Sequence, residues 1–108
     1  MMRMFTVVET PAFSKLCVDY WTEDERGAFV AWIAANPEAG DVIPGSGGCR
    51  KVRWSRAGSG KRGGVRVIHY NQLADGRIYL LLVYAKSAQD NVSAKVLLKI
   101  KEALHAHD

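Results

Sequence analysis

Arginine and lysine side chains are concentrated in the middle of this chain. Between Asp41 and Asp75 the sequence contains no Asp or Glu. The cationic residues of that stretch are Arg50, Lys51, Arg53, Arg56, Lys61, Arg62 and Arg66. A polyanion is the partner that this pattern favours, because regularly spaced phosphates can engage several such side chains at once. A solvated basic surface on an ordinary domain is the alternative, since charge alone is only an electrostatic footprint.

The segments 50–56 and 64–70, which carry most of these cations, alternate in the manner of β-strands. Alternation of period two puts polar and apolar side chains on opposite faces of a sheet. We therefore predict one basic face and one apolar face, the latter covered by helices. The basic face is expected to hold Lys51, Arg53, Ser55 and Arg66, and the apolar face Val52, Trp54, Val65 and Val67.

The loop between these strands contains Gly58-Ser59-Gly60-Lys61, which invites comparison with a phosphate-binding loop. A Walker A loop also needs an earlier glycine, where Ser55 stands, and a Ser or Thr after the lysine, where Arg62 stands. A strand rather than a helix is expected to follow, so we do not predict nucleotide hydrolysis.

Metal and carboxylate chemistry have little support in the sequence. His69, His105 and His107 do not form a metal-binding spacing, and Cys17 and Cys49 suit buried core positions. We expect no metal and no cofactor. Any chemistry is then expected to depend on cations, which stabilise charge on phosphoryl oxygens.

The composition is that of one globular domain spanning residues 1–108, with 48% hydrophobic and 24% charged residues. The N-terminus shows no signal-peptide pattern. The longest apolar run, Ile78 to Ala85, is too short to span a bilayer. We expect a cytoplasmic protein that is not membrane-bound.

Local signals place the elements of the first half. Residues 4–8 read as a strand, and Thr10-Pro11 reads as the start of a short helix. Thr22 and Glu25 predict a capping box at the start of a second helix, which Asn36-Pro37 should end. The faces expected to be buried are Phe13, Leu16, Cys17 and Tyr20 in the first helix and Phe29, Trp32 and Ile33 in the second.

The second half reads as loop, strands and a final helix. We expect Val42 and Ile43 of the loop 37–48 to face the core. A turn at residues 71–76 predicts that the strand 77–85 pairs antiparallel with the strand before it. The buried face of the C-terminal helix is expected to consist of Val92, Val96, Leu97, Ile100 and Leu104. The resulting order, β-α-α-β-β-β-α, predicts an α+β fold with a small, largely antiparallel sheet, an N-terminal helical hairpin and a C-terminal helix.

This order, together with the segments 58–70 and 79–86, resembles the RelE/ParE toxin superfamily of bacterial type II toxin-antitoxin systems, and in particular its HigB-like branch. The likeness covers nearly the whole chain and is most specific in Lys61-Arg62-Gly63-Gly64-Val65-Arg66-Val67-Ile68 and in Tyr84-Ala85-Lys86. It implies a RelE-like toxin that cuts messenger RNA in the ribosomal A site without a metal. A cognate antitoxin, usually a helix-turn-helix protein in this branch, would neutralise it.

Residue roles follow from the resemblance. Arg66 matches the family arginine that contacts the scissile phosphate, Lys51 and Arg53 match its basic pair, and Lys86 matches a basic residue after the last strand. The remaining cations expected to bind RNA are Arg50, Arg56, Lys61 and Arg62. The family tyrosine at the start of the last helix has no counterpart in residues 91–93, and neither Tyr70 nor Tyr84 is expected to replace it.

The expected reaction is attack of a ribose 2′-OH on the adjacent phosphate, with Lys51 or Lys86 as candidate proton carrier. Arg66 is expected on the open face of the sheet, close to Lys51 or Arg53, with Lys86 near the same cleft. Two other functions stay open: a ParE-like toxin that acts on DNA gyrase, and an RNA-binding module without catalysis.

Overall fold

A computed structural model describes residues 5–54, 64–85 and 92–105 of the chain. Apart from a two-residue strand, β2, the order of elements is the predicted one, and the α+β class is confirmed. The elements are β1 (Thr6–Glu9), α1 (Pro11–Cys17), α2 (Glu23–Ala35), β2 (Asp41–Val42), β3 (Arg50–Trp54), β4 (Val65–Gln72), a 3₁₀ turn (Leu73–Asp75), β5 (Arg77–Ala85) and α3 (Ala94–His105).

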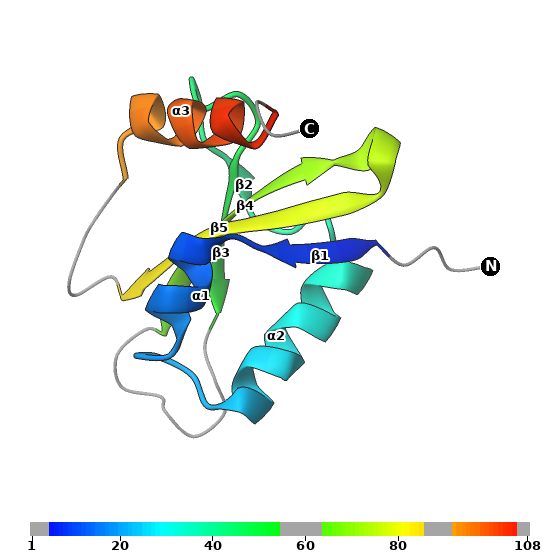
Figure 1. Cartoon of the computed structure of the whole chain (residues 1–108), viewed down its shortest axis with the longest axis vertical. Helices are drawn as coiled ribbons and strands as arrows, with labels where there is room; N and C mark the ends of the chain where they lie inside the picture. Colours follow the sequence, from blue (N-terminus) through cyan, green and yellow to red (C-terminus); the bar gives the residue numbers. More distant parts are fainter. Residues whose placement is uncertain (1–4, 55–63, 86–91, 106–108) are drawn as a thin grey trace.

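The strands form one five-stranded sheet in the order β1-β5-β4-β3-β2. Of the strand pairs in the described part of the chain, β1–β5 alone is parallel, so the prediction of a largely antiparallel sheet is confirmed. Figure 1 shows α1 and α2 on one side of the sheet and α3 on the other. Because β4 is the middle strand, side chains on both of its faces lie beneath other elements.

Short-range signals fix where α1 and α2 begin and end. The Thr10 side chain accepts a hydrogen bond from the amide of Phe13, and its hydroxyl donates to the carbonyl of Leu80 at 2.9 Å, which ties the start of α1 to β5. The capping box of Thr22 and Glu25 is present at the start of α2. Asn36 caps the C-terminal end of α2, as the following proline predicts.

The α1 and α2 side of the sheet carries an aromatic core. The Phe29 ring lies 5.2 Å from the Trp21 ring and 5.1 Å from the Trp54 ring, measured between centroids. Trp32 is half-buried and lies 5.0 Å from Trp54. The predicted inner face of α2 is therefore confirmed, with Phe29 at its centre.

A second core lies between the sheet and α3. Its buried members are Cys49, Ile68, Tyr79, Leu81, Tyr84 and Leu97. Cys49 lies in this core and Cys17 in the other, so the predicted burial of both is confirmed, and both are free thiols.

Two predicted core positions are wrong. Val96 is 48% exposed, because it lies about 100° around the helix from the buried Leu97. Val42 is 52% exposed, because it belongs to the edge strand β2. Ile43, its neighbour, does pack against the core on the α3 side.

Candidate nucleic-acid interface

A row of paired residues crosses three strands on the α3 side of the sheet. Arg53 on β3 pairs with Arg66 on β4, and Arg66 pairs with Tyr84 on β5. Directly paired residues of antiparallel strands project from the same face, so these three side chains are neighbours. We call Arg53, Arg66 and Tyr84 the cross-strand row. The prediction that Arg66 lies beside Arg53 is confirmed by this register.

A β-bulge brings Tyr84 into the row. Counting back from the turn, where Gln72 pairs with Arg77, regular pairing would place Val83 opposite Arg66. The structure instead pairs Ile68 with Leu82 and His69 with Leu80, so Leu81 is an extra residue in β5. One extra residue moves every later side chain of the strand to the other face. Tyr84 therefore lies on the face of Arg66 rather than against α1 and α2.

Burial differs sharply along the row. Arg53 is exposed, whereas Arg66 is 7% exposed and Tyr84 is 6% exposed. The expectation that Arg66 lies on an open face is therefore wrong. The physical reason is its place on the middle strand, whose α3 side is lined by the second core.

Like charges oppose each other in this row. Arg53 and Arg66 are direct cross-strand neighbours, an arrangement that destabilises a sheet when no anion is bound between the groups. Two guanidinium groups on adjacent strands also raise the local positive potential. The arrangement suits a phosphate, which several N–H donors can contact together.

The Tyr84 hydroxyl is the other polar group of the row. Within the described part of the chain it is buried and has no hydrogen-bond partner. Burial raises the pKa of Tyr84, and the positive charge of Arg66 opposes that rise. The phenol is therefore neutral at physiological pH and carries an O–H donor.

Lys51 and Arg50, the other cations of β3, lie on opposite faces. Lys51 is half-buried on the face of the row, between Asp41 and Ile68 on the neighbouring strands. An acidic residue thus stands beside the predicted basic face. Arg50 pairs with His69 on the other face, and its guanidinium donates to the carbonyls of Glu38 and Gly40 at 2.9 and 3.0 Å. The structure does not bring Arg50 together with the row.

The remaining predicted site residues, Arg56, Lys61, Arg62 and Lys86, lie outside the described residues. Their expected roles stay predictions.

His69, one of the histidines considered in the sequence, is buried in the sheet. Its Nδ1 lies 2.9 Å from the side-chain oxygen of Asn71, and its Nε2 lies 3.1 Å from the carbonyl of Ala39. The Asn71 amide in turn donates to the carbonyl of Pro37. These contacts hold the loop after α2 against the sheet. Burial lowers the pKa of His69, and the two hydrogen bonds oppose the shift without cancelling it.

We expect the stability of the fold to fall as the pH drops below about 6.5, the ordinary pKa of a histidine. The unfolded chain binds a proton at His69 more readily than the folded chain does, so acid favours unfolding. Urea denaturation at pH 7.5 and 5.5 measures the effect. In His69→Gln the free energy of unfolding should differ less between the two pH values than it does in the wild type. An unchanged difference would show that His69 is not the group responsible.

Metal-type clusters and pockets were the other kinds of site considered within the described residues. Among the described residues no group of three or more His, Cys, Asp or Glu side chains could hold a metal. An open pocket of about 600 Å³ lies between Phe5 and the C-terminal end of α2, near Trp32 and the segment 35–39. Trp32 packs on the α1 and α2 side, so this pocket is not part of the row.

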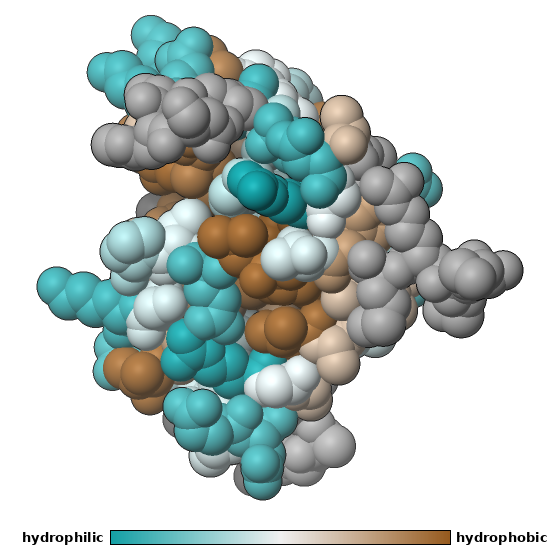
Figure 2. Space-filling view, turned by 45° about the vertical axis from the view of Figure 1, so that its right-hand side comes forward, coloured by the Kyte–Doolittle hydropathy of each residue, from teal (hydrophilic) through white to brown (hydrophobic). Residues whose placement is uncertain are grey.

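An apolar patch is visible in Figure 2. Apolar side chains reach the surface in the middle of the face turned forward, with hydrophilic side chains above and below them.

The helices of the described part include none that is long and apolar enough to cross a membrane.

The two helices on one face of the open sheet and the single helix on the other define a small α+β protein of RelE-like fold. A solved structure with this fold is that of the E. coli toxin RelE, as a double arginine-to-alanine mutant in the free state. It matches with a TM-score of 0.61 and 10% identity, over 82% of this chain and 90% of that chain. At this identity the likeness establishes the fold. No protein-family model matches the sequence.

Proposed function

We propose that this chain is the toxin of a type II toxin-antitoxin system, an endoribonuclease that cuts messenger RNA on the ribosome. The observation that carries the proposal is the cross-strand row, in which the buried Arg66 stands directly opposite a second arginine. The fold shared with the toxin RelE supports the same reading. The finer HigB-like assignment rests on the segment 61–68 and on Tyr84-Ala85-Lys86.

The proposed reaction uses the RNA's own nucleophile. The ribose 2′-oxygen attacks the adjacent phosphorus, the bond from phosphorus to the 5′-oxygen of the next nucleotide breaks, and the products are a 2′,3′-cyclic phosphate and a free 5′-OH. Negative charge grows on the non-bridging oxygens as the new bond forms. Arg66 stabilises that charge, and a guanidinium already fixed by its burial needs little reorganisation to do so.

Proton transfer and alignment complete the mechanism. One carrier accepts the 2′-OH proton and another donates a proton to the leaving 5′-oxygen, and the candidates are Lys51, on the face of the row, and Lys86. The ribosome holds the message in position, which reduces what the protein groups must contribute to alignment.

A protein partner belongs to this function. We propose a cognate antitoxin, of the helix-turn-helix kind usual in the HigB-like branch. The apolar surface in Figure 2 supports a protein partner, because exposed apolar patches often mark interaction sites.

Inducing the chain alone in bacteria should stop growth and leave cleaved messages, because translation is the proposed target. Transcripts are mapped by sequencing of their 5′ ends, and chromosomal DNA is examined in the same cells. Growth arrest with intact transcripts and broken DNA would instead favour an action on gyrase. Binding to RNA with neither arrest nor cleavage would favour a non-catalytic module.

A further inference from the structure

We propose that the Tyr84 hydroxyl is a third donor to the scissile phosphate, beside Arg66 and Arg53. The inference rests on the proposed function and adds to it a residue that the sequence analysis set aside. In the proposed contact the phenol O–H donates a hydrogen bond to a non-bridging phosphate oxygen.

The first argument is the state of the hydroxyl. Its oxygen is buried, and the described residues offer it no hydrogen-bond partner. Buried polar groups in native proteins are nearly always hydrogen-bonded, so an exception points to a ligand or to a functional role. A phenylalanine would fill the same apolar position without leaving a polar atom unsatisfied.

The second argument is position. The bulge at Leu81 puts Tyr84 directly beside Arg66, at the end of the row opposite to Arg53. Arg53 is exposed and marks the side from which an anion can approach, whereas Arg66 and Tyr84 are both buried. Arg66 is the middle member of the row, so a phosphate bound over it lies one strand from Arg53 and one strand from Tyr84.

The third argument is the chemistry of the group. A neutral phenol donates its proton in a hydrogen bond, and the nearby charge of Arg66 draws an anion toward it. The hydroxyl is covered in the free chain, so the contact forms only when the substrate enters. Catalytic hydrogen bonds that tighten only in the substrate complex are common.

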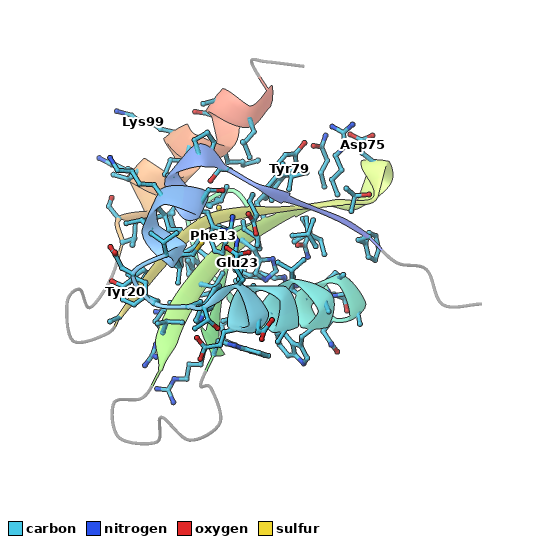
Figure 3. All side chains as sticks on the ribbon, turned by 60° about the horizontal axis from the view of Figure 1, so that its bottom comes forward. Phe13, Tyr20, Glu23, Asp75, Tyr79 and Lys99 are labelled. Carbon is cyan, nitrogen blue, oxygen red and sulfur yellow. The ribbon has the colours of Figure 1, made fainter. Side chains whose placement is uncertain are left out.

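The test compares Tyr84→Phe with a matched control on the same face of the sheet. Tyr79 is equally buried and packs in the same core, but its hydroxyl accepts a hydrogen bond from Arg77 at 3.4 Å. Figure 3 shows Tyr79 near Asp75, at the turn that connects β4 to β5, which is the far end of β5 from Tyr84. Tyr79→Phe therefore removes one tyrosine hydroxyl away from the row.

Each variant is measured for thermal melting and for cleavage of messenger RNA on programmed ribosomes. Tyr84→Phe should melt at the wild-type temperature or above it and should cleave about 100-fold more slowly. Tyr79→Phe should cleave at the wild-type rate. Cleavage by Tyr84→Phe within twofold of wild type, or a lower melting temperature with full cleavage per folded molecule, would overturn the inference.

A second readout separates this inference from the function on which it rests. Binding is measured to ribosomes programmed with a 2′-O-methylated message, which lacks the nucleophile. Tyr84→Phe should bind about tenfold more weakly or worse, because a hydrogen bond to a charged oxygen is lost. If the wild-type chain cleaves no message, the proposed function fails. The binding comparison then tests by itself whether the Tyr84 hydroxyl contacts the phosphate. Equal affinities would then overturn the contact.

Discussion

Replacing Arg66 with alanine should slow messenger RNA cleavage on the ribosome by about 100- to 1,000-fold, since one charged donor to the developing phosphorane is removed. Arg66 is 7% exposed, so the substitution also leaves a cavity, and the variant should melt below the wild-type temperature. This burial changes the expectation drawn from the sequence, which placed Arg66 on an open face of the sheet. The rates are therefore compared per folded molecule.

Two further variants serve as controls for Arg66→Ala. Arg66→Lys keeps the positive charge and loses the planar fork of N–H donors, so its rate should fall between those of wild type and Arg66→Ala. Lys15→Ala removes one positive charge from an exposed position on α1 and should leave cleavage unchanged. Equal rates per folded molecule for Arg66→Ala and wild type would show that the role of Arg66 is structural.

Phe29→Ala should lower the free energy of unfolding by about 3–5 kcal/mol, the cost of removing a fully buried aromatic ring. The Phe29 ring contacts the rings of Trp21, Trp32 and Trp54, so its loss opens a cavity at the centre of the core on the α1 and α2 side. Urea denaturation followed by tryptophan fluorescence measures the change.

The matched variants for Phe29 are Trp32→Ala and Val18→Ala. Trp32 is half-buried, so its replacement should cost less than that of Phe29, and less than the full core penalty that the sequence pattern predicts for it. Val18 is exposed at the end of α1, and its replacement should change stability by no more than about 0.5 kcal/mol. A Phe29→Ala cost as small as that of Val18→Ala would contradict the proposed packing of α2 on the sheet.

Local signals in the sequence were sufficient to predict most of the fold. A threonine cap followed by proline, and a capping box, place the starts of α1 and α2 because each satisfies backbone groups within a few residues. The start of the last strand at Arg77 follows from the turn before it. The two-residue strand β2 could not be predicted, because it exists only through its pairing with β3.

The candidate site was less predictable because it depends on long-range register. Alternation predicts that Arg53 and Arg66 share a face, and the structure confirms this. Nothing in the local pattern shows that Leu81 is an extra residue, and without that bulge Tyr84 would be assigned to the opposite face. The apolar side chains on both faces of the strand 77–85 were the available hint. They indicate a covered strand without locating the bulge.

The most direct test of the account is cleavage by the purified chain of one messenger RNA, presented free and presented on programmed ribosomes. The account predicts cuts on the ribosome that end in a 2′,3′-cyclic phosphate and a 5′-OH, little cutting of the free message, and loss of the ribosomal cuts in Arg66→Ala. An intact message on ribosomes, with the wild-type chain folded and in excess, would contradict it.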